Sequence, residues 1–521
     1  MKFRFLRALT AAGFCASMIF EYGLGVDFPL TPTLWLLIAG VALLAHTAVG
    51  QTTNSWTNSV NGTWRWEDAS NWSLGRKPLS SDSIFITNSV SAMPPNKFRV
   101  VVIDLSTATN FPETLLPQYV TLSGPGAFPF ATHNNLQVNG TGIGAFAIQR
   151  DLTVMANSSF SISNSQVDVG MSAFGGVFDD GTIQLTSGFF EIEHGLFVGY
   201  QGFGQMTISD GLFVMGTDVQ VGGGLAGAQG VMTFAGGTNL LQNLLIGYAN
   251  GNTGTVWVTG GQLDGSDAVL GQNAVGQMTV SNGTVQLIGL NVAQSLGSPA
   301  SGTFTVAGGT VTLSNNLTIG YGDCSVTGMV TLTGGELDVT NSSGTAVLEI
   351  INGTFNMSGG ILRVDKLVKT NSCAHFIQTG GTILLNPNLD ADSDGIPNGW
   401  EQQYGLDPFD PSDAVRDDDG DGFSNLQEYL AGTNPKDVNS RLRILAINPQ
   451  GDDVRIRWTT GRGRTNAVQA SDGTANGSFT DDFYDLVWIF SGGSGDITDQ
   501  FLDFGGATNT PSRFYRVRVV P

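Results

Sequence analysis

The sequence GTIQLTSG at residues 181–188 is the first of eight similar phrases, each a glycine, an alternation of apolar and polar residues, and a second glycine. The other seven phrases open at Gly204, Gly230, Gly254, Gly276, Gly302, Gly328 and Gly353. The period is therefore 22–26 residues. A repeat of that length predicts a stack of similar units and not one globular core.

Within each phrase, residues two apart lie on the same face of a strand. Two apolar columns are therefore predicted to face the core: Ile183, Met206, Met232, Val256, Met278, Phe304, Val330 and Phe355, and beside them Leu185, Ile208, Phe234, Val258, Val280, Val306, Leu332 and Met357. A second short apolar run follows the phrases, and a third ends in glycine, as at Gly199, Gly222 and Gly247. Glycine permits positive φ at corners. The pattern predicts an all-β protein built on a β-solenoid of the right-handed β-helix type, over residues 136–387.

Charge and cysteine content limit the choice of partners. The 521 residues carry a formal charge of −21, and no Lys or Arg occurs between Arg150 and Arg363. Nucleic acids and anionic membranes need clustered basic residues, so neither is expected as a partner. Of the three cysteines, Cys324 and Cys373 are expected two turns apart, roughly 10 Å, which is too far for a disulfide if they share a face.

Residues 1–50 have the features of an export leader. Basic residues precede an apolar run, and Ala48-Val49-Gly50 places small residues where signal cleavage prefers them. The leader is long, so an uncleaved anchor and a start codon placed too early remain open alternatives. If the leader is retained, it is the expected membrane attachment.

Residues 51–135 are rich in tryptophan and predict a β cap over the end of the solenoid. The segment Trp64 to Ile86, with Asn71-Trp72-Ser73, resembles the opening of secreted autotransporter-like β-solenoid proteins, which are common in Verrucomicrobia and Planctomycetes. The resemblance implies a secreted or cell-surface bacterial protein. The C-terminal segment lacks the long amphipathic strands of a transporter barrel, which is a departure from the autotransporter pattern.

Residues 388–438 contain two acidic twelve-residue loops, DADSDGIPNGWE (390–401) and DDDGDGFSNLQE (417–428). Carboxylates at positions 1, 3 and 5, a backbone carbonyl at 7, a side chain at 9 and a glutamate at 12 supply the oxygens that Ca²⁺ prefers, and glycine at 6 permits the turn. The predicted ligands are Asp390, Asp392, Asp394, Ile396, Asn398 and Glu401 in the first loop, and Asp417, Asp419, Asp421, Phe423, Asn425 and Glu428 in the second. A short helix is expected after each loop, over 400–404 and 426–430.

The loops resemble EF-hand-like, dockerin and thrombospondin type 3 calcium repeats, in which additional acidic residues such as Asp407, Asp410 and Asp413 are familiar. Pro397 lacks the N–H through which paired EF-hands join their loops. A compact dockerin-like or type 3 module is therefore expected, and not a sensor that opens.

Residues 439–521 predict a small antiparallel β-sandwich. Trp458, the run Val468 to Ser471 and the terminal Arg513 to Val517 resemble a fibronectin III-like module of secreted bacterial proteins.

Two classes of function follow from these predictions. The first is an exported, calcium-binding, structural or adhesive surface protein without catalytic activity, whose partners are polysaccharide or other cell-surface components. The alternative is a carbohydrate-active β-helix enzyme or a glycan-binding protein. Candidate acids for a hydrolase are Glu191, Glu193 and His194, or Asp264 and Asp267, but no matching carboxylate is expected on an adjacent turn. The central turns lack the Lys or Arg base of a lyase.

Overall fold

The computed structural model describes residues 52–93, 96–127, 131–172, 175–249, 251–295, 300–324, 326–461, 463–474, 477–478, 482–492, 495–508 and 512–520. The predicted leader, residues 1–50, lies outside the described residues. Met1–Thr52 and Thr53–Pro521 are separate units, and nearly all of the described residues belong to the second. Among the described residues, no helix is long and apolar enough to cross a membrane.

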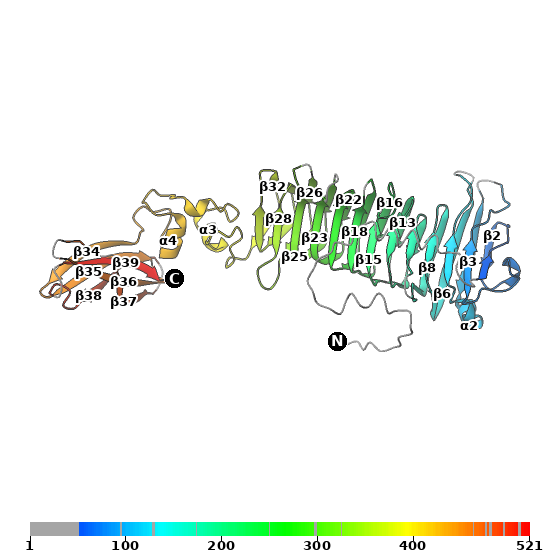
Figure 1. The fold of residues 1–521 in the computed structure, drawn as a ribbon, viewed down its shortest axis with the longest axis horizontal. Coiled ribbons are helices and arrows are strands. Elements are labelled where there is room, and N and C mark those ends of the chain that lie inside the picture. The colour runs from blue at the N-terminus through cyan, green and yellow to red at the C-terminus, as the bar shows by residue number, and fades with distance from the viewer. Residues whose placement is uncertain are drawn as a thin grey trace. The chain divides into compact units, whose positions relative to one another are not determined.

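The eight phrases form the middle of a long parallel ladder, ladder A, in which each strand pairs with the strand one turn away (Figure 1). Matching phrases stay in register, so that Met206 lies opposite Met232 and Thr207 opposite Thr233. In chain order, ladder A contains β2 (Gly62–Arg65), β4 (Phe98–Asp104), β6 (His133–Ile148), β8 (Ser158–Val169), β10 (Thr182–Leu185), β13 (Phe203–Ile208), β16 (Gln229–Phe234), β19 (Thr253–Val258), β22 (Val275–Val280), β24 (Ser301–Val306), β26 (Thr327–Leu332), β29 (Gly353–Met357) and β32 (Ala374–Gln378).

Two further parallel ladders complete each turn and confirm the β-solenoid. Ladder B continues from β6 and β8 through β11 (Gly188–Ile192), β14 (Leu212–Met215), β17 (Thr238–Leu240), β20 (Gln262–Asp264), β23 (Thr284–Gln294), β25 (Thr310–Tyr321), β27 (Glu336–Val339), β30 (Ile361–Val364) and β33 (Thr382–Leu385). Ladder C contains β1 (Thr52–Ser55), β3 (Asp82–Ile86), β5 (Tyr119–Leu122), β7 (Leu152–Val154), β9 (Val177–Asp179), β12 (Leu196–Val198), β15 (Asp218–Val221), β18 (Asn243–Tyr248) and β21 (Asp267–Gln272), then the second halves of β23 and β25, β28 (Val347–Ile350) and β31 (Lys366–Lys369).

The core lies between the three ladders. Both predicted apolar columns are confirmed, because every residue named in them is at most 1% exposed. The column that alternates with them is uncharged and consists of threonines and one tryptophan: Thr207, Thr233, Trp257, Thr279, Thr305 and Thr331 follow one another in register. Burial on one face and solvation on the other explain the alternation in the sequence.

Glycine occupies the corner where ladder C ends on several turns, and Ala293 takes the equivalent position on one turn with φ of +64°. Gly222, Gly247 and Gly271 have φ of +64°, +65° and +71°, in the left-handed region. A Cβ on Gly247 would overlap the carbonyl oxygen of Val275, on the next turn of the solenoid. At Gly247 the backbones of successive turns therefore approach too closely for a side chain to fit without a shift.

The N-terminal turns carry an aromatic cluster. Trp56, Trp66 and Trp72 are at most 2% exposed and pack edge to face, with centroids of adjacent rings 4.9 and 5.2 Å apart. Trp66 also packs on Phe146 of β6, at 5.5 Å. A short helix, α2 (Leu105–Asn110), follows β4, and Asp104 caps its N-terminus. The tryptophans thus belong to the same continuous core as the repeats.

Cys324 and Cys373 form a disulfide, with their Cα atoms 6.0 Å apart, so the expectation that they lie too far apart was wrong. Each cysteine lies in a loop that precedes a ladder A strand, β26 or β32. On the turn between them, β28 ends at Ile350 and β29 begins at Gly353, so the corner holds only two residues. The spacing between strands fixes the distance between residues in the strands but not between residues in loops. The two loops that carry the cysteines are longer than the corner between them, and they meet beyond it.

Beyond the solenoid, the acidic segment contains α3 (Asn398–Tyr404) and α4 (Asn425–Ala431), which confirm the two short helices. Each helix ends at a glycine in the left-handed conformation, Gly405 or Gly432. The C-terminal residues form two three-stranded antiparallel sheets: β34 (Arg443–Gln450), β35 (Asp453–Gly461) and β38 (Asp496–Asp503), and β37 (Tyr484–Ser491), β36 (Arg464–Gly473) and β39 (Ser512–Val520). Trp458, which is fully buried, belongs to their common core.

The corner glycines give a stability prediction. Gly247→Ala places a side chain at positive φ, which costs about 1–2 kcal/mol, and also against the backbone of the next turn. Gly227→Ala is the matched control, because Gly227 has φ of +87° but a Cβ added there would have no atom within 4 Å. We expect thermal unfolding of the Gly247 variant well below that of the Gly227 variant. Equal unfolding temperatures would show that the close approach does not matter.

Candidate metal centre

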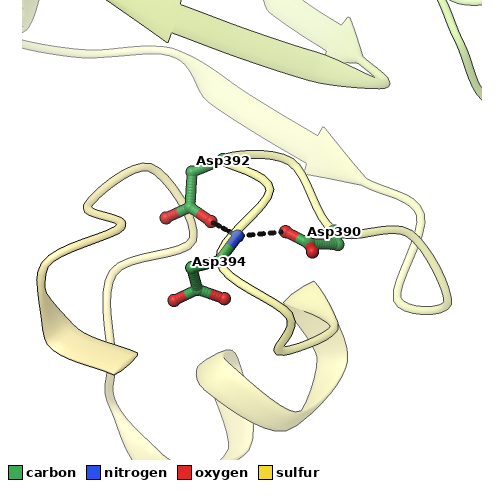
Figure 2. Close-up of side chains that lie close together, drawn as sticks. All are labelled: Asp390, Asp392 and Asp394. Carbon is green, nitrogen blue, oxygen red and sulfur yellow. Dashed lines mark hydrogen bonds between the residues drawn. The ribbon is translucent and has the colours of Figure 1, made fainter. Parts of the chain in front are cut away.

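The first acidic loop wraps its backbone around its own carboxylates. The Asp390 carboxylate accepts hydrogen bonds from the N–H groups of residues 393–395, at 2.7, 3.2 and 2.9 Å. The Asp394 N–H also donates to Asp392, at 3.3 Å, and lies between the two carboxylates (Figure 2). Gly395 makes the turn with φ of +97°. The loop thereby brings oxygens of all three aspartates within 4.8 Å of one another.

The second loop has the same geometry. Asp417 accepts from the N–H groups of residues 420–422, at 2.8, 3.2 and 2.9 Å. The Asp421 N–H donates to Asp419 at 3.1 Å, and Gly422 has φ of +98°. Oxygens of its three aspartates also lie within 4.8 Å. Two independent stretches of sequence therefore fold into the same carboxylate-lined loop.

The glutamates at position 12 are buried with carboxylate oxygens that have no hydrogen-bond partner. Glu401, on α3, is fully buried, and neither of its carboxylate oxygens has a hydrogen-bond partner. Glu428, on α4, is 1% exposed, and its Oε2 has no partner. An ionised carboxylate in such a place is costly unless a cation lies beside it.

Asp413 joins the first loop from the far end of its own segment. It lies in a 3₁₀ turn, η4 (Asp413–Val415), and is fully buried. Oxygens of Asp394, Glu401 and Asp413 lie within 4.8 Å of one another. Its Oδ2 accepts from the Asp407 N–H at 2.9 Å, whereas its Oδ1 has no partner. The ligand prediction did not include Asp413, because the twelve-residue motif ends before it.

The asparagines at position 9 hold the loops together. Asn398 accepts from the Ala391 N–H at 3.0 Å and donates to the Asn386 carbonyl at 2.9 Å, so both ends of its amide are used. Asn425 likewise donates to the Asp413 carbonyl, at 2.8 Å, but its Oδ1 has no partner. Both side chains are fully buried. They close each loop onto the residues that precede it.

The backbone N–H groups of the residues at position 7 donate hydrogen bonds to the aspartates at position 5. Ile396 donates to Asp394 at 2.7 Å, and Phe423 donates to Asp421 at 2.9 Å. The Ile396 side chain is fully buried against Leu406. This small apolar cluster anchors the first loop.

Electrostatic repulsion inside the loops is strong. Burial, followed by repulsion from Asp392 and Asp394, raises the pKa of Glu401 from 4.5 to about 8. Burial and repulsion from Asp419 and Asp421 raise the pKa of Glu428 to about 8. Without a cation, the two glutamates hold protons at neutral pH.

These observations fit a hard cation. Buried oxygens without partners, all from carboxylates or amides, converge in each loop, and Ca²⁺ is bound by six to eight such oxygens. Among the described residues, the two loops share no β-bridge, in contrast to the paired loops of an EF-hand. Each loop would hold an ion through its aspartates and its helix glutamate.

The second loop also matches a known family. Residues 417–438 match a family model described as a bacterial TSP3 repeat, which is of a calcium-binding type. The searches of curated proteins and of solved structures found no match. The match covers one of the two loops, and the shared hydrogen-bond pattern extends the similarity to the other.

The candidate residues on the solenoid require one correction. Glu191, on β11, lies in register with Asp168, on β8, so an adjacent turn does offer a matching carboxylate. Burial raises the pKa of Asp168, and burial, Glu193 and Asp168 raise that of Glu191. The other candidates, Asp264 and Asp267, have no carboxylate partner in register.

The raised pKa values predict an unusual pH dependence. In the unfolded chain both glutamates ionise near pH 4.5, but in the calcium-free fold they ionise near pH 8. Between these values the folded state binds more protons, so its stability falls as pH rises. We expect the unfolding temperature of the acidic segment in chelator to fall between pH 5 and pH 8.

Calcium should remove this dependence, because it binds the ionised carboxylates. Its uptake at pH 7 should release protons, which calorimetry in two buffers of different ionisation enthalpy measures. The double variant Glu401→Gln, Glu428→Gln is the control and should lose the part of the pH dependence that the two glutamates cause, while Asp392, whose pKa burial and the neighbouring aspartates raise to about 7, keeps its own part. Stability in chelator that rises from pH 5 to pH 8 would contradict the burial of these carboxylates.

Proposed function

We propose that this chain is an exported, calcium-binding structural protein of the bacterial cell surface or extracellular space. The solenoid serves as a spacer, and the acidic module stiffens the junction between the solenoid and the C-terminal sheets. The observation that carries the proposal is the fully buried Glu401 carboxylate, which has no partner in a loop that already holds three aspartates. No catalytic step is assigned to the module.

Export is supported by the Cys324–Cys373 disulfide, since such bonds persist mainly in oxidising compartments outside the cytosol. The TSP3 match supports the same location, because these repeats occur in extracellular proteins. Calcium is abundant there, and extracellular modules work with modest affinities. The proposal also includes a relationship to autotransporter-like β-solenoid proteins and adhesion of the chain to polysaccharide.

The role at the junction is supported by contacts on both sides of the module. The Leu367 N–H of β31 donates to the Ala391 carbonyl in the first loop, at 3.0 Å. Arg464 of β36 donates to the carbonyls of Tyr429 and Leu430 on α4, at 2.7 and 2.9 Å. Ions in the two loops would therefore stabilise the segments that touch the flanking domains.

The proposal predicts calcium-dependent protection from trypsin. Arg416 and Lys436 are the basic residues of the module, and their side chains are 50% and 41% exposed. Because Ca²⁺ binds only the folded loops, it should slow cleavage after both residues by at least about tenfold relative to chelator. Peptide mapping by mass spectrometry over time measures the rates.

Cleavage sites outside the module provide the internal control, because their rates should not depend on calcium. The double variant Glu401→Gln, Glu428→Gln should be cleaved rapidly in both conditions. Equal cleavage of the unaltered chain with calcium and with chelator would refute the proposal.

A carbohydrate-active solenoid is the second candidate, and the register of Asp168 with Glu191 favours it. Strands in a sheet are about 4.8 Å apart, and retaining glycosidases place two carboxyl groups about 5–5.5 Å apart. Asp168 is 7% exposed and accepts from the Gln166 amide. A raised pKa on Glu191 suits a general acid.

A screen for release of reducing ends from polysaccharides tests this candidate. Hydrolysis that Glu191→Gln abolishes, and that Asp264→Asn leaves unchanged, would favour the enzyme over the scaffold. On a glycan array, loss of retention in Trp257→Ala would instead indicate binding by the polar face of ladder A. If neither reaction nor retention is detected, the scaffold proposal stands alone.

A further inference from the structure

The acidic module is an internal repeat of 27 residues, in which Asp390–Arg416 corresponds to Asp417–Arg443. The hydrogen bonds follow this period beyond the loops. The Asp407 N–H donates to Asp413 at 2.9 Å, and the Asn434 N–H, 27 residues on, donates to Ser440 at 2.9 Å. Asp413 and Ser440 are therefore equivalent positions, and both are buried.

Asp413 and Ser440 differ in the number of side-chain oxygens that remain available to a metal ion. The Asp413 carboxylate has two oxygens, one of which accepts the bond from Asp407 while Oδ1 stays without a partner next to Glu401. Ser440 has one oxygen, which accepts the bond from Asn434, and it carries no charge. The first site thus has a fifth carboxylate that the second lacks.

A second difference concerns the helix glutamates. In the second site the Thr433 hydroxyl lies 3.4 Å from Glu428 Oε1 and bonds to it. The equivalent residue of the first site is Leu406, which cannot donate a side-chain hydrogen bond, and both Glu401 oxygens stay without partners. Glu401 can therefore offer both oxygens to an ion without breaking a bond.

Basic residues lie beside both sites. Arg441 donates to the Asp421 carbonyl at 3.1 Å, and Lys436 pairs with Asp418 at 2.5 Å, beside the second loop. Beside the first site, Arg416 lies 3.5 Å from Asp413 Oδ2. The difference between the sites therefore rests on their ligands and not on the surrounding basic residues.

Together, these differences leave unequal sets of buried side-chain oxygens without partners. The first site has Asp392 Oδ2, Asp394 Oδ2, Glu401 Oε1 and Oε2, and Asp413 Oδ1. The second has Asp419 Oδ2, Asp421 Oδ2 and Glu428 Oε2, with the neutral Asn425 Oδ1.

We propose that the two sites are unequal, that Asp413 is a direct ligand of the first, and that calcium fills the first site before the second. The proposal rests on the calcium-binding function proposed above. Affinity in such loops is set largely by the number of charged ligands. The sites therefore respond to different calcium concentrations, the first as a permanent structural site and the second as one that exchanges its ion.

Calorimetric titration of Ca²⁺ into the chelator-treated full chain tests the order. We expect two phases whose dissociation constants differ by at least about tenfold. Glu401→Gln should remove the tight phase and Glu428→Gln the weak one, which assigns each phase to a loop. Asp413→Asn keeps an acceptor for the Asp407 N–H but loses the charge, and should weaken the tight phase by about tenfold or more.

Asp410→Asn is the matched control, since Asp410 lies in the same segment but bonds to Ser412. It should change the tight phase by less than about threefold. Ser440→Asp is the reverse substitution and should lower the dissociation constant of the weak phase. It keeps the test decisive if circular dichroism shows that Asp413→Asn is misfolded.

Two sites of equal affinity, or a tight phase that Asp413→Asn leaves intact, would overturn the inequality while leaving calcium binding in place. A chain that takes up no calcium would overturn both this proposal and the proposed function.

Discussion

The solenoid depends on the contact between backbones at the corner where ladder C ends. Gly247 lies against the carbonyl of Val275 and the opening glycine of the next phrase, Gly276. A glycine with positive φ on one turn meets a phrase glycine on the next, and this arrangement recurs at Gly222 and Gly254. Where glycine occupies the corner, no side chain separates the backbones, and the phrases of successive turns lie in register. Ala293 takes the equivalent position on one turn, also with positive φ (+64°). The close stacking of the turns keeps the apolar columns and the outer face aligned.

The acidic module is organised by the opposite condition, an excess of one charge. Between Asp390 and Asp437 the chain has 13 acidic residues and only Arg416 and Lys436 as basic ones. Glu401 and Glu428 are buried at the ends of loops whose aspartates are already engaged by backbone N–H groups. In the solenoid, buried polar atoms without a partner, such as Asp179 Oδ2 and Asn239 Oδ1, are scattered over separate turns, whereas in the module they gather in the two loops. Among the described residues, the carboxylate clusters that could hold a cation lie in this short segment between the solenoid and the C-terminal sheets.

Much of the fold could be predicted from periodicity. Apolar residues at every second position, within a repeat of 22–26 residues, are compatible with few arrangements of strands. The columns through Met232 and Phe234, the corner at Gly247 and the helices after both acidic loops followed from local rules. What could not be predicted depends on contacts between loops of different turns. The Cys324–Cys373 bond needs the length of an intervening corner, and the Asp168–Glu191 pair needs the register between β8 and β11. Asp413 was named among the additional acidic residues but not among the ligands, because the twelve-residue motif ends before it and only the fold brings it to Glu401.

The Cys324–Cys373 bond has a mechanical consequence. A solenoid whose turns contact only their neighbours can peel from one end, one turn after another, when its terminus is pulled. The bond joins loops that precede β26 and β32, and the turn of β29 lies between these two strands. Tension that enters from the C-terminal side can detach β33 and β32, but at Cys373 it passes through the covalent link to Cys324. The strands between the two cysteines, β26 to β31, are therefore not pulled out, and the disulfide limits unravelling from the end that adjoins the acidic module.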